Sequence, residues 1–214
     1  MKLHAPMMPT EFSLHHSIEI ILKEAYEQEE DVSCYLFEHD FASSFELDKL
    51  EINQSKFLDC KILQCKFSRM FFIDVIFENC DLSNTDFSDC NFARVLFKNC
   101  KLVGCNFPDG MFTNILFQDC NLHYANFTLS TFRNVSFTSC DLTSSNIEEV
   151  QLHETEFISS TLLRVQFVRT PLKGIDFTSD ILEGIVITGN ELKGAIVSPM
   201  QAVELSKLLG LIIQ

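Results

Sequence analysis

The sequence predicts an all-β protein, a four-sided β-helix of about eight coils closed by a helix at its C-terminal end. The first observation is a period of five: every fifth residue from Leu47 to Val197 is apolar, and no insertion breaks the register. The second is that 16 of the 21 phenylalanines fall in this phase. A strand alternates every two residues and a helix repeats every 3.6, so neither element alone gives this period.

Each five-residue unit has the residues of a short strand followed by a turn. The position two before the large apolar residue holds small or β-branched residues such as Cys80, Thr85 and Val95, as alternation along a strand requires. The second position after it holds five of the seven glycines and several asparagines, which tolerate the positive φ of a tight turn. Four such corners close a square, so we expect coils of twenty residues.

Sorting the large apolar residues by twenties gives columns of like side chains. Leucines recur from Leu82 to Leu182 in one column, after Ile62. A coil of twenty residues stacks such a column into a ladder inside the tube. The longest aromatic column is the expected core ladder: Phe57, Phe77, Phe97, Phe117, Phe137, Phe157 and Phe177.

The repeat resembles that of the pentapeptide-repeat family, whose consensus is a small residue, Asp or Asn, Leu or Phe, and two polar residues. The stretches "CDLSN" at 80–84, "TDFSD" at 85–89 and "CNFAR" at 90–94 carry the resemblance. It covers about residues 36–198 and implies a right-handed quadrilateral β-helix, a pentapeptide-repeat solenoid. We expect an acidic N-terminal cap segment before it, residues 1–35, and a C-terminal helix and strand after it, residues 199–214.

The N-terminal end departs from the register. Before Leu47 the phase slips: Leu36 and Phe41 lie one residue off, and Ala42 stands where a large residue belongs. We therefore expect one extra residue near 42–46 and an irregular first coil. Residues 13–29 are expected to be helical or, alternatively, extended into the first coil, and in either case to cover a stack edge that would invite aggregation.

The C-terminal stretch "SPMQAVELSKLLGLIIQ" has helix signals: Ser198 as N-cap, Pro199 at the first position and Gly210 as the stop. A short strand is expected after the helix. Its apolar residues fit either a cap on the last coil or a dimer interface. The stretch resembles the dimerisation module of Qnr-type proteins, the pentapeptide-repeat group that protects type II topoisomerases from quinolones. The expected interface residues are Met200, Val203, Leu208, Leu209 and Leu211.

The composition gives no sign of catalysis, and we expect no enzyme, cofactor or metal. Eight of the nine cysteines occupy the small inward position and are expected to be buried thiols. The alternative is a disulfide between stacked coils, which the spacing of the coils also allows. The six histidines lack metal-ligand spacing, and there is no glycine-rich phosphate loop. No apolar run is long enough for a transmembrane helix, and no signal-peptide core is present, so we expect a cytoplasmic protein.

The formal net charge of −14 argues against direct nucleic-acid binding and is compatible with binding a protein that itself binds nucleic acid. The Qnr-type resemblance implies a DNA-mimicking rod, a homodimer, that binds DNA gyrase or topoisomerase IV and modulates it. Many Qnr-type proteins have loops that contribute to quinolone resistance, and this chain has none, so inhibition is the safer expectation. A cation-free acidic strip is the expected binding face: Asp86, Asp89, Asp109, Glu148 and Glu149.

The alternative function is a passive protein-binding scaffold with an unrelated partner. Its basis is an outer apolar stripe formed by Ile76, Leu96 and Leu116, at positions that should be polar. An exposed stripe of this kind can mark a partner site.

Overall fold

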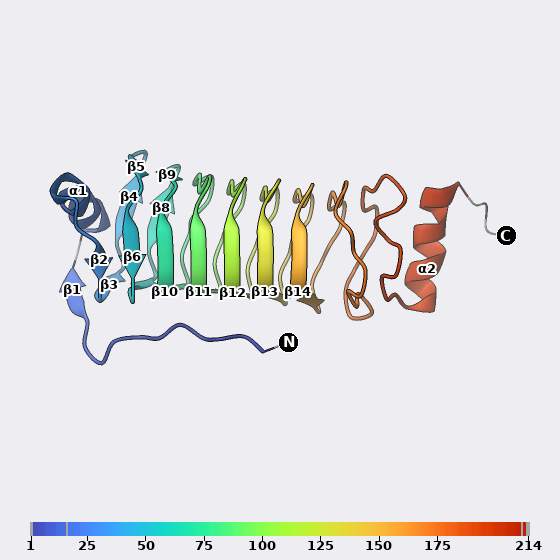
Figure 1. Ribbon diagram of the computed structural model, residues 1–214, viewed down its shortest axis with the longest axis horizontal. Coiled ribbons are helices and arrows are strands. Elements are labelled where there is room, and N and C mark those ends of the chain that lie inside the picture. Colours follow the sequence, from blue (N-terminus) through green and yellow to red (C-terminus); the bar gives the residue numbers. More distant parts are fainter. Residues whose placement is uncertain (1, 16, 211, 213–214) are drawn as a thin grey trace.

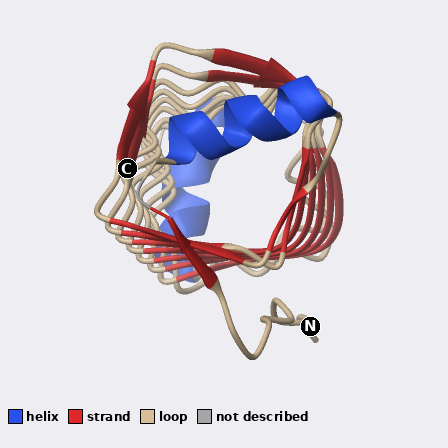
Figure 2. Ribbon diagram, turned by 90° about the vertical axis from the view of Figure 1, so that its left-hand side faces the viewer, coloured by secondary structure: helices blue, strands red, loops and turns tan. Residues whose placement is uncertain are grey.

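The computed structural model describes residues 2–15, 17–210 and 212. The chain forms a parallel β-solenoid of about seven turns, close to the eight coils expected, with a short helix at its C-terminal end (Figure 1). Viewed along its axis the solenoid is a four-sided tube (Figure 2). We name each wall by one central buried residue: the Phe92, Phe97, Leu102 and Phe107 walls, met in that order along each coil.

The strands are short in the first coils and long in the middle of the rod. Long strands cover the Phe92 and Phe97 walls and the corner between them, whereas the other two walls of these coils are held by single β-bridges. The short strands are β2 (Val32–Ser33), β3 (Tyr35–Glu38), β4 (Phe41–Ser43), β5 (Glu46–Asp48), β6 (Glu51–Asn53), β7 (Lys56–Leu58), β8 (Lys61–Leu63) and β9 (Lys66–Ser68). The long strands are β10 (Phe71–Glu78), β11 (Asn91–Lys98), β12 (Met111–Gln118), β13 (Thr131–Thr138) and β14 (Gln151–Ile158).

Neighbouring coils pair in parallel with an offset of twenty residues, as the sequence predicts. Phe72 pairs with Phe92, and Phe92 with Phe112. Phenylalanines stack inside the tube: the ring centroids of Phe97 and Phe117 lie 4.8 Å apart with the rings 6° from parallel. This spacing equals the distance between hydrogen-bonded strands, so backbone pairing and ring stacking reinforce each other.

The corners adopt the left-handed backbone conformation that the sequence predicts for glycine and asparagine. Asn79 and Asn99 have φ of 56° and 51°. Many corners carry other residues in the same conformation, at a cost of about 1–2 kcal/mol each for a residue with a Cβ. Side-chain ladders offset part of this cost: Asn99 Nδ2 donates to Asn79 Oδ1 (2.9 Å), and Asn79 Nδ2 donates to Asp59 Oδ1 (3.0 Å).

The inward cysteines are free thiols that bridge consecutive coils. Cys100 Sγ donates to the carbonyl of Phe77 (3.4 Å), and Cys120 Sγ to that of Phe97 (3.3 Å). Burial raises the pKa of Cys90 to about 12, so this thiol stays protonated at neutral pH. These cysteines therefore act as small hydrophobic residues that also satisfy buried carbonyls.

The expected phase slip at the N-terminal end is wrong. Phe37 pairs with Phe57 and Ala42 with Ile62, so the register continues back to Val32 without an extra residue. Ala42 is buried although it is small, while Phe45 is buried at a position that elsewhere holds a small residue. The large and small side chains have exchanged places in this coil, which hid the register from a search for large residues.

The N-terminal end of the tube is covered by a helix, α1 (Ile18–Gln28), after a short strand, β1 (Ser13–His15), that pairs with β3. Ser17 caps α1, and Ile18, Ile21 and Leu22 are buried against the first coil. The helix thus begins later than expected, because residues 13–15 extend the sheet instead.

The C-terminal end is covered by α2 (Pro199–Ser206), which continues into a short 3₁₀ helix, η1 (Lys207–Leu209). Ser198 and Gln201 form a capping box, with Pro199 at the first helical position. Gln201 Nε2 also donates to the carbonyls of Phe177 (2.7 Å) and Asp180 (2.8 Å). Gln201 therefore replaces the hydrogen bonds that a further coil would make. The strand expected after the helix lies outside the described residues.

Candidate protein-binding surface

The expected acidic strip lies along the Phe107 wall and its corner, and its five carboxylates are in different environments. Asp89 and Asp109 are exposed at consecutive corners, with φ of 58° and 57°. No hydrogen bond or ion pair is made by either side chain within the described residues. These two carboxylates are therefore solvated, as expected, and lie one coil apart on the outside of the rod.

Asp86 is half-buried and is part of the wall itself. Its Oδ1 accepts hydrogen bonds from the Ser88 N–H (3.0 Å) and hydroxyl, and from Asn106 Nδ2 (3.3 Å). Asn126 in turn donates to Asn106 (2.7 Å). Asp86 is therefore not a freely solvated side chain, because the repeat uses this position to brace the following turn.

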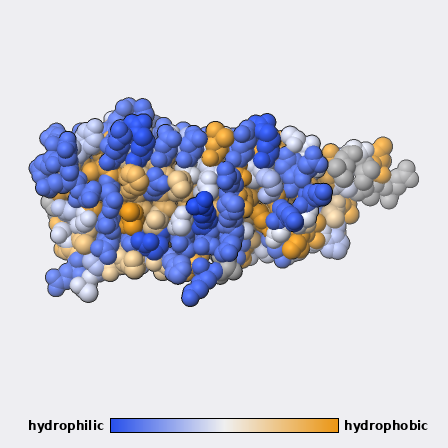
Figure 3. Space-filling model, viewed as in Figure 1, coloured by the Kyte–Doolittle hydropathy of each residue, from blue (hydrophilic) through white to orange (hydrophobic). Residues whose placement is uncertain are grey.

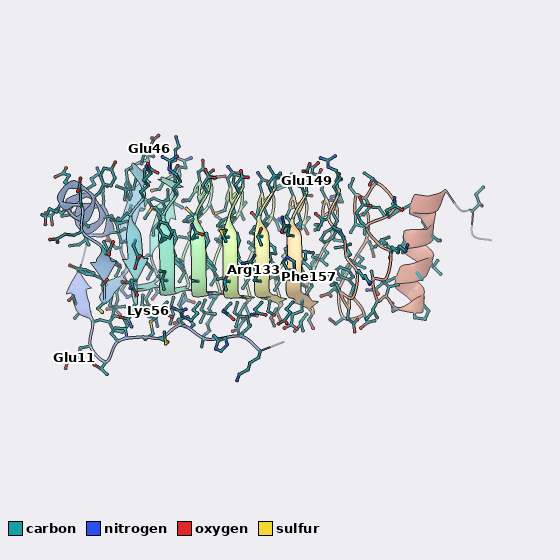
Figure 4. All side chains as sticks on the ribbon, in the orientation of Figure 1. Glu11, Glu46, Lys56, Arg133, Glu149 and Phe157 are labelled. Carbon is teal, nitrogen blue, oxygen red and sulfur yellow. The ribbon has the colours of Figure 1, made fainter. Side chains whose placement is uncertain are left out.

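Glu148 and Glu149 are paired with a cation from the next coil. Arg169 Nε donates to Glu149 Oε1 (2.8 Å), and its Nη2 lies 2.5 Å from Glu148 Oε1. At the other end of the same corner row, Arg69 pairs with Asp48 (2.5 Å). The strip is free of cations only between these two arginines, and Glu149 lies near its C-terminal limit (Figure 4).

Other carboxylates of the walls are neutralised by stacked cations. Glu78 accepts from Lys56 (2.8 Å) and Lys98 (2.9 Å) on the Phe97 wall. At the preceding corner, Asp74 is almost fully buried and forms two bonds with Arg94 (2.6 and 2.7 Å). Burial alone would raise the pKa of Asp74, but the bonds from Arg94 outweigh it and hold the pKa below its usual value. Asp89 and Asp109 differ from these groups because neither side chain forms a bond to a cation among the described residues, although Arg69 stands one coil before Asp89 and its charge interacts with that carboxylate.

The apolar stripe of Ile76, Leu96 and Leu116 is half-buried. The N-terminal segment, residues 2–12, runs along the rod beside this wall (Figures 1 and 2). The Met7 N–H donates to Asp74 Oδ1 (2.8 Å), and the Met7 carbonyl accepts from Gln54 Nε2 (3.2 Å). The segment is thus anchored to the corner next to the stripe, and the surface there is less open than the sequence indicates.

The chain carries no visible apparatus for metal chemistry in the residues that the structure describes. Within these residues, no group of three His, Cys, Asp or Glu side chains could hold a metal ion. His123 Nε2 lies 2.7 Å from Asp141 Oδ2 on the Leu102 wall, and this is a surface pair. Among the described helices, none is long and apolar enough to cross a lipid bilayer.

Family models match the central coils. The model described as "Pentapeptide repeat region" matches residues 50–127, and the one described as "Pentapeptide repeats (8 copies)" matches residues 111–148. Residues 50–148 thus match pentapeptide repeats, and the chain has the pentapeptide-repeat fold. A search of curated proteins gave no match.

Two solved structures illustrate what this chain is similar to. A trypsin-treated variant of QnrB1, described as a plasmid-mediated fluoroquinolone resistance protein, is 21% identical, with a TM-score of 0.57; the match covers 96% of this chain and 100% of QnrB1. HetL, a pentapeptide-repeat protein involved in heterocyst differentiation regulation in the cyanobacterium Nostoc, is 12% identical, with a TM-score of 0.42; the match covers 86% of this chain and 98% of HetL. At 21% identity, the likeness to QnrB1 concerns the fold alone.

The C-terminal helix α2 and the 3₁₀ helix after it present several of the expected interface residues to solvent. Met200 is 79% exposed, and Val203 and Leu208 are each 44% exposed. Leu205, which the sequence analysis did not single out, is the buried residue of α2. Leu211 lies outside the described residues, as does the side chain of Leu209.

Sequence reasoning missed a basic row on the Phe92 wall. Arg133, His153, Lys173 and Lys193 follow one another at intervals of twenty residues, all exposed. None of the four has an ion-pair partner within the described residues. Sorting the positions after each large apolar residue by twenties would have found the row. Figure 3 shows one side of the molecule, on which hydrophilic residues surround apolar patches.

Proposed function

We propose that the chain is a non-enzymatic, Qnr-type DNA mimic that binds a type II topoisomerase, DNA gyrase or topoisomerase IV, and modulates it. The observation that carries the proposal is a straight rod with unpaired carboxylates, Asp89 and Asp109, on consecutive coils of one corner. A DNA-binding surface is lined with cations, and such a surface attracts a rod of opposite charge.

The charge density of the rod supports a partial likeness to DNA. About seven turns at about 4.8 Å each give a length of about 34 Å. With a formal charge of −14, the mean spacing is one charge per about 2.4 Å, compared with about 1.7 Å in duplex DNA. The acids are concentrated toward the N-terminal end, because residues 1–46 hold ten acidic and two basic residues.

A homodimer through α2 would place the two acidic ends far apart and double the rod. The exposed side chains of Met200, Val203 and Leu208 form the apolar surface for this contact. Beside them, a cavity of about 330 Å³ lies between α2 and the last coil, lined by Ile181, Leu182 and Val203 among others. Apolar residues of a second copy would bury this surface.

A supercoiling assay with DNA gyrase, run with and without a quinolone, tests the proposal. We expect the wild-type protein to inhibit supercoiling, and added salt to weaken the effect because attraction is screened beyond about 8 Å at physiological ionic strength. Absence of inhibition, and of drug protection, would contradict the topoisomerase partner.

The binding face is tested separately with Asp89→Lys combined with Asp109→Lys. Both side chains are exposed, so the fold is retained. We expect inhibition to weaken about tenfold or more, which corresponds to a loss of about 1.4 kcal/mol or more in binding free energy. The matched control is Asp119→Lys combined with Glu183→Lys, which makes the same charge change at exposed positions elsewhere. Equal losses in both double variants would show that only net charge matters.

The alternative function, a passive scaffold with an unrelated partner, loses its original basis. That basis was the stripe of Ile76, Leu96 and Leu116, which the structure shows half-buried beside the N-terminal segment. The acidic corner row therefore remains the better-supported contact surface.

A further inference from the structure

The ladder of backbone hydrogen bonds between coils is interrupted after β14. On the Leu102 and Phe107 walls the ladder continues, with Leu162 N–H donating to Ile181 O (2.8 Å) and Phe167 N–H to Val186 O (2.9 Å). On the other two walls no backbone-to-backbone hydrogen bond joins residues 152–159 to residues 171–179, all of which the structure describes. We call this gap between β14 and the next coil the seam.

The sequence explains where the seam forms. In earlier coils the residue before the large apolar one donates its N–H to the preceding coil: Met111 to Cys90 O (2.9 Å), and Gln151 to Ser130 O (3.0 Å). Pro171 occupies the equivalent position of the next coil and has no N–H to donate. One hydrogen bond of the ladder is therefore lost, because the proline ring replaces the amide hydrogen.

A second substitution lies on the Phe97 wall. Thr155 stands where Val95, Ile115 and Val135 stand in earlier coils, and its hydroxyl is buried without a hydrogen-bond partner. The rings of Phe157 and Phe177 are 5.7 Å apart, compared with 4.8 Å for Phe117 and Phe137. The coils thus separate at this point, and Figure 1 shows the coils after β14 without strands.

The seam opens to the surface as a cavity of about 510 Å³. Its walls are residues 154–158 of β14 and residues between 174 and 179 of the next coil. Three carboxylates line it, those of Glu154, Glu156 and Asp176, and no lysine or arginine does. Phe157, near the middle of one wall, is labelled in Figure 4.

Backbone donors line this cavity. In an earlier coil, Asn84 N–H and Phe87 N–H donate to the next coil, to Val103 O (2.9 Å) and Asn106 O (2.7 Å). The repeat places the N–H groups of Glu154 and Phe157 at the same positions, where neither has a backbone partner. An unpaired strand edge is a template for another strand.

We propose that the seam is a binding site for an extended peptide segment with basic side chains. Because the Phe157 and Phe177 rings are only 5.7 Å apart and a paired strand needs about 4.8 Å on each side, binding would part these two coils, and the edge of β14 would then pair with the backbone of the segment, as in strand addition to a sheet edge. Glu154, Glu156 and Asp176 select cationic side chains, and the cavity lies in the size range of ligand sites, about 300–1,000 Å³. The proposal does not depend on a topoisomerase partner.

Hydrogen exchange of the free protein tests the open edge. The backbone amides of Glu154 and Phe157 should exchange about fivefold faster than those of Asn134 and Phe137 one coil earlier, because a hydrogen bond contributes about 1 kcal/mol. Exchange at equal rates would mean that the seam is closed in solution, and would overturn the proposal.

Binding is tested by fluorescence anisotropy with a labelled hexapeptide of alternating lysine and valine. We expect this peptide to bind, and two control peptides to fail: one with glutamate in place of lysine, and one with proline in place of valine, which lacks the backbone donors. Glu154→Gln and Glu156→Gln should each weaken binding by up to about fivefold, the strength of an exposed ion pair. Equal binding of the glutamate peptide would contradict the charge selection.

A closing variant provides the decisive control. Thr155→Val with Pro171→Thr restores the residues of earlier coils, so it should fold, recover slow exchange at Phe157 and lose peptide binding. Binding that survives in a variant with restored protection would place the peptide elsewhere and refute the seam. If the wild type forms a dimer but binds no peptide, and the closing variant is a monomer, then a second copy of the chain occupies the seam instead.

Discussion

Asp180→Asn should remove a pH dependence of the free energy of unfolding that arises in the last coil. Asp180 occupies the inward position that Cys100, Cys120 and Cys140 hold in earlier coils, and only 6% of it is exposed. Its Oδ1 accepts from the Ser160 N–H (2.7 Å), and its Oδ2 is buried without a partner. Burial raises the pKa of Asp180 to about 6, because ionisation is unfavourable there.

The magnitude follows from the difference between the pKa values of the folded and unfolded states. A rise from 3.8 to about 6 corresponds to about 3 kcal/mol, at about 1.36 kcal/mol per unit. The folded state binds the proton more tightly, so this stability is fully present below about pH 4 and is lost as the pH rises through 6. Asparagine keeps the acceptor for Ser160 and carries no charge. The variant should therefore be more stable than the wild type at pH 7.5, by up to about 3 kcal/mol.

Urea unfolding followed by circular dichroism at pH 4, 5, 6 and 7.5 measures the effect. The free energy of unfolding of the wild type, minus that of Asp180→Asn, should fall by about 2.4 kcal/mol between pH 4 and pH 7.5. Glu183→Gln, at an exposed carboxylate of the same five-residue unit, is the control and should leave the slope unchanged. A constant difference between the wild type and Asp180→Asn over this range would refute the reasoning, since it would mean that Asp180 titrates normally.

Two further predictions concern the core and the C-terminal helix. Phe97→Ala should lower the free energy of unfolding by about 3–5 kcal/mol, since Phe97 is fully buried between Phe77 and Phe117, while the exposed Gln151→Ala should change it by less than about 0.5 kcal/mol; similar losses for both in denaturant unfolding would show that the inward assignment is wrong. Met200→Asp with Val203→Asp should give a folded monomer in sedimentation experiments at micromolar concentration where the wild type is a dimer, and a variant that stays dimeric would exclude α2 as the interface.

The walls, corners and ladders could be predicted because the repeat is local and strict. Each position in the five-residue unit has one environment, so residue type alone indicates whether Phe97 or Cys100 points inward. The first coil was misread because volume, not residue type, is what the interior requires. Ala42 with Phe45 fills about the space of a large and a small residue in the reverse order.

The seam could not be predicted from the same pattern. Leu152 and Leu172 keep the period of five across it, and this period reports which side chains face inward. It does not report whether the backbones of adjacent coils are close enough to pair. Pro171 was the available signal, because a proline at a hydrogen-bonded position removes a donor from the ladder.

Tertiary contacts decide the environment of individual charges, and residue type does not. Glu191 stands at a position that is outward in other coils, yet it is buried and accepts hydrogen bonds from the N–H groups of Arg169 (3.0 Å), Thr188 (3.0 Å) and Gly189 (2.8 Å). Burial would raise its pKa, but these bonds and the Thr188 hydroxyl outweigh burial and lower the pKa to about 2. The last coil folds around this carboxylate in a loop that the five-residue period does not predict.

The extent of the acidic strip shows how charges should be assessed in a solenoid. Residues twenty apart are neighbours here, so a corner carboxylate is flanked by the corners of the coils before and after it. Applied to the row that contains Asp89 and Asp109, this rule extends the row to Arg69 at one end and Arg169 at the other. Arg169 then pairs with Glu148 and Glu149, which leaves two unpaired carboxylates rather than five.

The junction after β14 is the weakest of the rod when each coil is compared with its neighbours. In a stack of repeats, stability is approximately a sum of terms between adjacent coils. The junction after β14 lacks the backbone bonds of two walls, whereas the junctions from β10 to β14 have paired strands there. Local opening should therefore concentrate at the seam, since low-stability regions are those with few hydrogen bonds. The seam lies between the acidic corner row and α2, so a peptide bound there would alter the junction that connects the proposed partner-binding surface to the proposed dimer interface.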